Sequence, residues 1–238
     1  QLAPLQSVKV ASAEGETNAR LKTNSLGLRA DEIVVPKPSH VLRIVCLGDE
    51  TWLGSQLDET ATLHPKLKAH LQPFTTQEVE VINAALPDSC PLLSYLQVRH
   101  HLLALQPDVW LVQLDPTDIA DDAKFRRYVD LDAQETPLVC VHPDLLTQPK
   151  IKPLCEHFLC VKWMKLKATQ CFAESDTAAE HNELAMPTSH ISSAQVSKVA
   201  LTVRPICQLA QLVEPFGSRV VCVVHPRTQE LLTSAEQP

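Results

Sequence analysis

The sequence predicts an α/β domain in which a parallel β-sheet is covered by helices on both faces. Between residues 42 and 114, short apolar runs alternate with longer segments of helical periodicity, as in parallel sheets with helical crossovers. Hydrophobic residues make up 45% of the 238 residues, enough for one large core. We therefore expect an extended arm over residues 1–40 and one α/β domain over residues 41–238.

The first part of the domain predicts a strand, a helix and a second strand. Residues 42–47 form an apolar run that Gly48 closes as a turn residue. Residues 60–71 carry a leucine at every fourth position, which favours a helix with one apolar stripe. Residues 78–83 (EVEVIN) alternate between polar and apolar, as expected of a strand.

The next elements extend the same alternation. Residues 91–105 favour a helix with Pro91 in its first turn. Residues 109–114 form the third apolar run. Right-handed crossovers between successive strands would place all three strands in one parallel sheet.

The second half of the chain is less regular. Residues 125–142 contain two strand-like pieces around a polar stretch, which predicts a β-hairpin inserted into the α/β frame. Residues 152–168 favour a helix, and residues 196–213 favour a longer one that Pro205 should kink. Residues 219–224 form a last apolar strand.

Charge and hydropathy argue against nucleic-acid binding and against a transmembrane helix. The net charge of −7, with no basic block, disfavours nucleic-acid binding through phosphate neutralisation. No apolar run reaches the roughly 18–20 residues that a transmembrane helix needs. No motif in the sequence indicates a cofactor.

The eight cysteines favour free thiols over a disulfide framework. Cys46, Cys140 and Cys222 lie inside predicted buried strands, where cysteine packs as a small hydrophobe. The group Cys155, His157 and Cys160 lacks a second pair at zinc-site spacing, so a metal site is not expected there.

Five short motifs carry a family resemblance. Residues 44–49 (IVCLGD) join an apolar strand to Gly-Asp, and residues 80–85 (EVINAA) join a second strand to Asn-Ala. Residues 105–109 (LQPDV) and 115–118 (DPTD) surround the third strand, and residues 23–29 (TNSLGLR) precede the first. In this order they resemble the SGNH (GDSL-type) hydrolase superfamily. The resemblance implies a three-layer, flavodoxin-like sandwich that performs acyl transfer.

The departures from the family pattern fall on its catalytic positions. The family's nucleophilic serine corresponds to Glu50, and a carboxylate attacks esters poorly. The family's oxyanion-hole glycine and asparagine correspond to Ala85 and Thr117. The loss of one such donor typically costs ~10²–10³ in rate.

The general base of the family is also missing as a motif. The resemblance implies a late Asp-x-x-His block, and no aspartate in the chain has a histidine three residues later. After the last predicted strand, the residues up to Pro238 leave little room for such a block. His225 follows that strand and is read as a strand-end residue before Pro226.

Three functions therefore compete. The first is a catalytically inactive domain that binds a partner, a carbohydrate or a small ester-like ligand beyond the carboxyl ends of the strands. Its binding candidates are Asp49, Glu50, Ala85, Thr117, Asp118 and His225. The second is a residual or altered ester hydrolase.

The third hypothesis is a metal-assisted hydrolase. The carboxylates of Asp49, Glu50, Asp115 and Asp118 follow neighbouring strands. Four carboxylates brought together would repel one another unless a cation such as Mg²⁺ or Ca²⁺ neutralised them. The competing interpretation, in which Asp49 supports the turn and Asp115 faces solvent, is the stronger one, and no metal is expected. The compartment stays open: relatives often work outside the cytoplasm, whereas the cysteines favour reduced thiols.

Overall fold

The computed structural model describes residues 2–9, 20–141 and 193–225. The chain divides into two compact units, residues 1–140 with 197–238 and residues 141–196. Nearly all described residues belong to the first unit. The predicted helix over residues 152–168 lies outside the described residues, as do Cys155, His157 and Cys160, where no metal site was expected.

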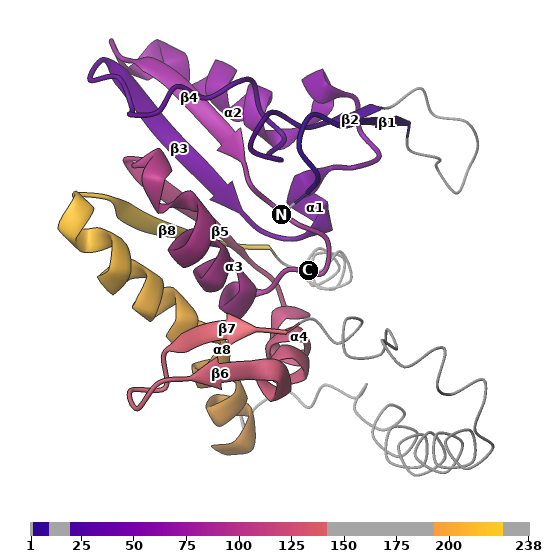
Figure 1. Ribbon diagram of the computed structural model, residues 1–238, viewed down its shortest axis with the longest axis vertical. Helices are drawn as coiled ribbons and strands as arrows, with labels where there is room; N and C mark the ends of the chain where they lie inside the picture. Colours follow the sequence, from indigo (N-terminus) through magenta and orange to yellow (C-terminus); the bar gives the residue numbers. More distant parts are fainter. Residues whose placement is uncertain (1, 10–19, 142–192, 226–238) are drawn as a thin grey trace, which may run out of the picture. The chain divides into compact units, whose positions relative to one another are not determined.

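The centre of the first unit is a four-stranded parallel sheet (Figure 1). Its strands are β3 (Val41–Leu47), β4 (Glu78–Asn83), β5 (Val109–Leu114) and β8 (Arg219–Val224). They lie in the order β4-β3-β5-β8, and every neighbouring pair is parallel. The four strands predicted from three apolar runs and one alternating segment are confirmed, and so is their parallel arrangement. The expectation that Cys222 of β8 is buried is wrong, because this residue is exposed.

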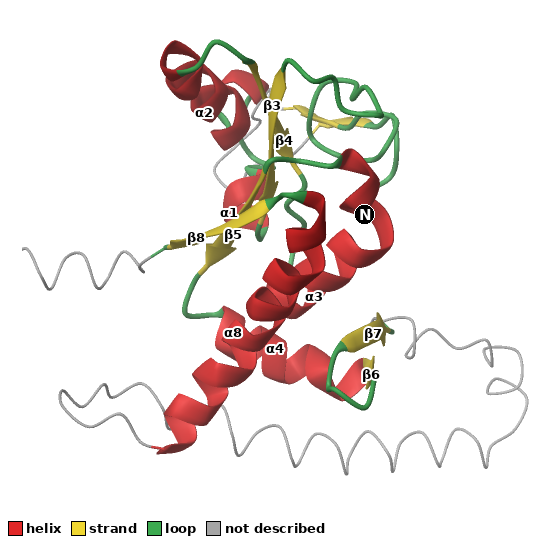
Figure 2. Ribbon diagram, turned by 90° about the vertical axis from the view of Figure 1, so that its left-hand side faces the viewer, coloured by secondary structure: helices red, strands yellow, loops and turns green. Residues whose placement is uncertain are grey.

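Helices cover both faces of this sheet, as the sequence predicted (Figure 2). One face packs against α3 (Pro91–Gln97) and α8 (Ser193–Val213), and the other against α1 (Glu50–Leu53) and α2 (Leu63–Leu71). Alternate residues of each strand serve the two faces because side chains in a strand alternate with period two. The fold class is therefore the predicted layered α/β arrangement.

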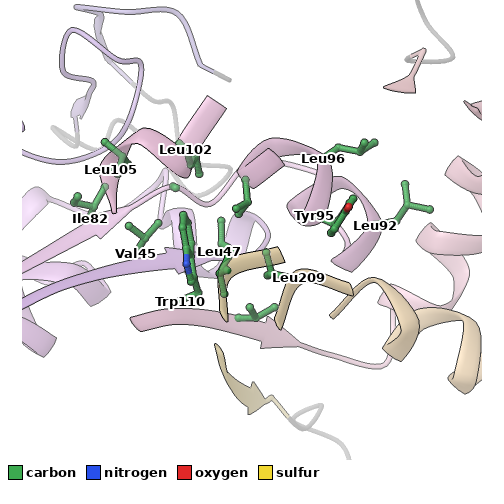
Figure 3. Close-up of a cluster of buried hydrophobic side chains, with 14 of the residues drawn as sticks. Val45, Leu47, Ile82, Leu92, Tyr95, Leu96, Leu102, Leu105, Trp110 and Leu209 are labelled. Atoms are coloured by element: carbon green, nitrogen blue, oxygen red, sulfur yellow. The ribbon is translucent and has the colours of Figure 1, made fainter. Parts of the chain in front are cut away.

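The larger hydrophobic cluster lies between the sheet and the α3–α8 side (Figure 3). Trp110 is 1% exposed and sits at its centre, against Val45 and Leu47 of β3 and Leu209 of α8. The helix that starts at Pro91 continues as a π turn (Val98–Leu102) and a 3-10 turn (Leu103–Leu105). These turns keep further leucines on the core face.

The predicted insertion is confirmed as a hairpin. Strand β6 (Val129–Leu131) pairs antiparallel with β7 (Pro137–Cys140). The Asp132 carboxylate closes the turn by accepting hydrogen bonds from the amides of Gln134 and Thr136 at 2.9 and 2.8 Å. Helix α4 (Asp118–Phe125) leads from β5 to this hairpin.

The remaining elements are short. Strands β1 (Ser7–Lys9) and β2 (Arg20–Lys22) pair antiparallel. Four further 3-10 turns occupy Glu59–Ala61, Gln72–Phe74, Arg126–Tyr128 and Glu214–Phe216. None of the helices in the described ranges is long and apolar enough to cross a membrane.

Residues 23–29 of the predicted arm lie against the α/β domain. The Asn24 side chain accepts hydrogen bonds from the amides of Leu26 and Leu28, both at 3.0 Å. Leu28 belongs to the main core, and Arg29 is fully buried. A domain boundary at residue 40 stays a prediction.

Candidate functional site

The candidate site begins where β3 ends. Asp49 caps α1 by accepting a hydrogen bond from the Thr51 amide at 2.8 Å. Glu50 is the first residue of α1, and its exposed carboxylate accepts a hydrogen bond from the Ser55 hydroxyl at 2.9 Å. The Glu50 side chain thus bonds to the turn that follows α1. Its negative charge is also favourable in the first turn of α1, because the N-terminus of a helix carries a partial positive charge.

The position after β4 is tied into internal hydrogen bonds. Ala85 is 2% exposed, and its amide donates to Asn83 Oδ1 at 3.1 Å. Asn83 in turn donates through Nδ2 to the Trp52 carbonyl at 2.8 Å. The Ala85 N–H, which the family resemblance places in an oxyanion hole, already has a partner.

The turn after β5 is held by its own carboxylates. Asp115 Oδ1 accepts hydrogen bonds from both the amide and the hydroxyl of Thr117, the amide at 2.6 Å. Asp118 Oδ2 accepts from the Asp115 amide at 2.8 Å. The Thr117 hydroxyl is therefore committed to Asp115.

The pKa values of Asp115 and Asp118 are shifted in opposite directions. Burial alone would raise the pKa of Asp115, but the hydrogen bonds with Thr117, Asp49 and Asp118 together lower it. Burial raises the pKa of Asp118 to about 7, and the nearby charges of Asp115, Asp122 and Asp49 act in the same direction. The Asp118 carboxyl is therefore the group of this site that titrates near neutral pH.

The structure brings three of the predicted residues together. Asp49, Asp115 and Asp118 line one narrow pocket beyond the carboxyl ends of β3 and β5. Its other lining residues are Gly48, Ser89, Cys90, Ser94 and Gln113. The pocket has no room for a water molecule. Three carboxylates in one narrow pocket make a negative environment, which opposes the formation of an oxyanion.

Four other predicted residues do not line this pocket. Glu50 and Thr117 are engaged in the local hydrogen bonds described above, and Ala85 is buried in the core on the α1–α2 side. The His225 backbone amide donates to the Leu114 carbonyl at 2.7 Å, and its side chain is exposed. Among the described residues, no histidine lines the pocket or hydrogen-bonds to Glu50.

Sequence reasoning missed four polar or thiol residues of the pocket wall. Ser89 and Ser94 are buried, and their hydroxyl oxygens lie 3.4 Å apart. Cys90 precedes α3, and burial raises the pKa of its thiol. Gln113 stands out as a polar residue inside an apolar strand, and this was the signal that could have found it.

A resident metal does not fit this arrangement. Within residues 2–9, 20–141 and 193–225, no three side chains of His, Cys, Asp or Glu are grouped so as to hold a metal ion. Instead, carboxylate oxygens of Asp49 and Asp115 accept hydrogen bonds from backbone amides.

Comparisons with known proteins find a likeness only among solved structures. No family model matches the sequence, and no curated protein matches it. The crystal structure of AlinE4, a SGNH-hydrolase family esterase, is 14% identical over 72% of this chain and 97% of that chain, with a TM-score of 0.31.

Two further structures are similar to the same degree. A catalytic mutant of Axe2, an acetylxylan esterase from Geobacillus stearothermophilus, is 14% identical over 75% of this chain and 74% of that chain, with a TM-score of 0.29. TesA is 12% identical over 72% of this chain and 99% of that chain, also with a TM-score of 0.29. At these values the chemistry of this chain has to be argued from its own side chains.

Proposed function

We propose that this chain is an SGNH-hydrolase-like protein without ester hydrolase activity, which serves as a binding or interaction domain. The proposal combines the motif resemblance with the state of the three positions that would carry the chemistry. Glu50 stands where the resemblance expects the nucleophile, and Ala85 and Thr117 stand where it expects oxyanion-hole donors.

The proposal depends mainly on one observation: at all three positions, the group that would take part in catalysis already hydrogen-bonds to another group of the chain. The Ala85 amide is bonded to Asn83, the Thr117 hydroxyl to Asp115, and the Glu50 carboxylate to Ser55. An oxyanion hole needs donors that are free and aimed at the developing charge. Here the Ala85 amide and the Thr117 hydroxyl face acceptors of the chain itself.

The narrow pocket favours an interaction role over the enclosure of a small molecule. Small-molecule sites are typically concave spaces of about 300–1,000 Å³, whereas this pocket does not admit a water molecule. A carbohydrate or ester-like ligand would therefore have to contact the mouth of the pocket. Binding of sugars and their acetyl esters can be measured directly by calorimetry.

Hydrolysis of p-nitrophenyl acetate tests the loss of activity. We expect the wild-type chain to show no turnover above buffer, while an active SGNH esterase assayed in parallel turns over. Glu50→Ser should remain inactive, because a serine hydroxyl alone restores neither the free donors nor a base. Ser55→Ala is the matched control, since it removes only the partner of Glu50.

The alternative is a residual ester hydrolase, and the same assay separates the two. Wild-type turnover that Glu50→Ala abolishes would overturn the proposal and assign Glu50 a catalytic role. Turnover that survives Glu50→Ala but disappears in Asp118→Asn would also overturn it, and would move the chemistry to Asp118.

A further inference from the structure

The outer edge of β4 carries a second feature, separate from the candidate site. Backbone groups of a strand alternate between its two sides. The amides of Glu78 and Ala84 donate toward β3, to the carbonyls of His40 at 3.0 Å and Cys46 at 2.9 Å. Even-numbered residues of this segment therefore face β3, and odd-numbered residues face away from the sheet.

Both ends of this outer edge are closed by groups of the chain itself. At the start of β4, the Gln72 side chain accepts from the Val79 amide and donates to the Gln77 carbonyl, both at 2.9 Å. At the end of β4, the Arg29 amide donates to the Asn83 carbonyl at 3.1 Å. Gln72 and Arg29 thus take the place of a neighbouring strand at the two ends.

Val81 lies between these two closed ends, and its backbone hydrogen-bonding groups are unpaired. By the alternation, its N–H and C=O face outward, and neither makes a hydrogen bond within the described residues. The residue is only 6% exposed. Buried backbone groups are nearly always paired, with the protein, with water or with a ligand. An open pair in this position therefore indicates a place for a partner.

A cavity of about 250 Å³ lies against this edge. Ala30, Ile33 and Ile82 supply apolar wall, and Val81 reaches the cavity although its side chain packs in the core on the α1–α2 side. On the α2 side the wall is formed by His64, Pro65 and Lys68. The volume is slightly below the usual range for ligand sites, so it suits about one residue of a peptide.

The charged wall of the cavity is mainly acidic. Its carboxylates are Asp31, Glu32, Glu59, Glu78 and Glu80. The buried guanidinium groups of Arg29 and Arg43 pair with Glu59 and Glu80.

Two carboxylates of this wall remain for a ligand. Among the described residues, no hydrogen bond or ion pair engages the Asp31 carboxylate, and the Glu78 carboxylate has only the exposed His40 imidazole near it, at 3.9 Å. Lys68 is the one lysine of the wall, and it is exposed. The uncompensated charge of the cavity therefore favours a cationic ligand.

We propose that this cavity binds one extended residue of a basic peptide, a lysine or an arginine, through a single β-bridge to Val81. The peptide N–H and C=O would pair with the open groups of Val81, as in strand addition to a sheet edge. The cationic side chain would lie near Asp31 and Glu78. This site shares no lining residue with the candidate site beyond the carboxyl ends of β3 and β5.

The test uses the full chain and a blocked arginine, N-acetyl-arginine N′-methylamide, as the probe. We expect saturable binding with a Kd on the order of 1 mM, seen as a shift of the Val81 amide in ¹⁵N–¹H NMR spectra. The uncharged blocked norleucine should bind about tenfold more weakly, which corresponds to about 1.4 kcal/mol. Ethylguanidinium, which has the charge without the peptide groups, should also bind more weakly.

The double variant Asp31→Asn, Glu78→Gln should weaken binding of blocked arginine about fivefold to tenfold. Glu214→Gln is the control, because it removes an exposed carboxylate elsewhere. Absence of a saturable shift in the wild-type chain at about 10 mM probe would overturn the proposal. Equal binding of blocked norleucine would overturn the role of charge, and equal binding of ethylguanidinium would overturn the bridge to Val81.

Discussion

The Gln113 side chain lies directly against the α-carbon of Gly48. A β-carbon built on residue 48 would stand 2.5 Å from Gln113 Oε1 and 2.9 Å from Gln113 Cβ. Gln113 is 4% exposed, and its Oε1 has no hydrogen-bond partner among the described residues. The glycine at the end of β3 is therefore required by the close approach of β5, independently of any catalytic role.

Gly48→Ala should destabilise the protein by ~1–3 kcal/mol, because the added methyl overpacks a buried contact. In a Gln113→Ala background the same change should cost less, since the nearest atom is then absent. Urea denaturation of the two single variants and the double variant measures this coupling.

Gly217→Ala provides the control for that cycle. Gly217 has a φ of +74°, and a β-carbon there would meet nothing within 4 Å. Its substitution costs roughly 1 kcal/mol through backbone strain alone, and this cost should be the same with or without Gln113. Full additivity of Gly48→Ala with Gln113→Ala would show that the contact with Gln113 Oε1 has no energetic weight, because the Cβ of residue 113 remains in both backgrounds.

The frame of the fold was predictable because its signals are local. Three strands of the central sheet are mainly apolar runs, β4 alternates between polar and apolar residues, and α2 carries leucines at every fourth position. The positions of these strands and of α2 therefore follow from the residue pattern of each segment. Asp49, Asp115 and Asp118 line one pocket because the carboxyl ends of parallel strands share one edge of the sheet, although the stronger interpretation of the sequence placed Asp115 toward solvent.

The rest depends on contacts that leave no local pattern. The Arg29 side chain hydrogen-bonds to residues 24 to 30 positions away in the sequence. No periodic pattern in the sequence predicts such pairs. Ser89 and Ser94 enter the pocket from the loop before α3 and from α3 itself. The hydrogen bond from the Ala85 amide to Asn83 is the local exception, since it joins residues two positions apart. The other contacts follow from the assembled backbone.

Asp118→Asn should change the pH dependence of stability. The pKa of Asp118 is raised to about 7 in the folded protein, above the ordinary value of about 3.9 in the unfolded chain. The folded state therefore binds the extra proton between these values, and stability falls as pH rises from about 4 to about 7. Asparagine retains an acceptor for the Asp115 amide and removes the titration.

The size of this effect is on the order of 1–4 kcal/mol between pH 4 and pH 8. Urea denaturation across that range should show the variant gaining stability relative to wild type as pH rises. Asp58→Asn, at an exposed loop residue, serves as the control. A wild-type and variant pair with parallel pH profiles would contradict the raised pKa.

Asn24→Ala should destabilise the domain, although residue 24 lies in the predicted arm. Its side chain is 4% exposed; it accepts from two amides and donates to the Asp31 carbonyl at 3.0 Å. Loss of these bonds leaves buried backbone groups unpaired, at an expected cost of ~1–3 kcal/mol. The exposed Ser39→Ala is the control, and an Asn24→Ala melting curve identical to wild type would mean that the arm unfolds separately.

Arg29 shows why the arm and the domain are expected to unfold together. The guanidinium is fully buried and donates to the carbonyls of Leu53, Gly54 and Leu57 and to Glu59. Arg29→Met fills similar volume but removes the guanidinium donors from three carbonyls and from Glu59, which should cost ~3–5 kcal/mol. Arg29→Lys should recover only part of this, because an ammonium cannot reproduce the planar fork of donors.

Arg204 supplies the matched comparison for Arg29. It pairs with Glu135 through side chains that are 40% and 58% exposed, and exposed ion pairs contribute only about 0–1 kcal/mol. Arg204→Met should therefore leave the midpoint of urea denaturation nearly unchanged. If Arg29→Met shifted that midpoint no more than Arg204→Met, the buried guanidinium would not link residues 23–29 to the loop after α1, and the arm would have to be held by apolar contacts such as those of Leu28.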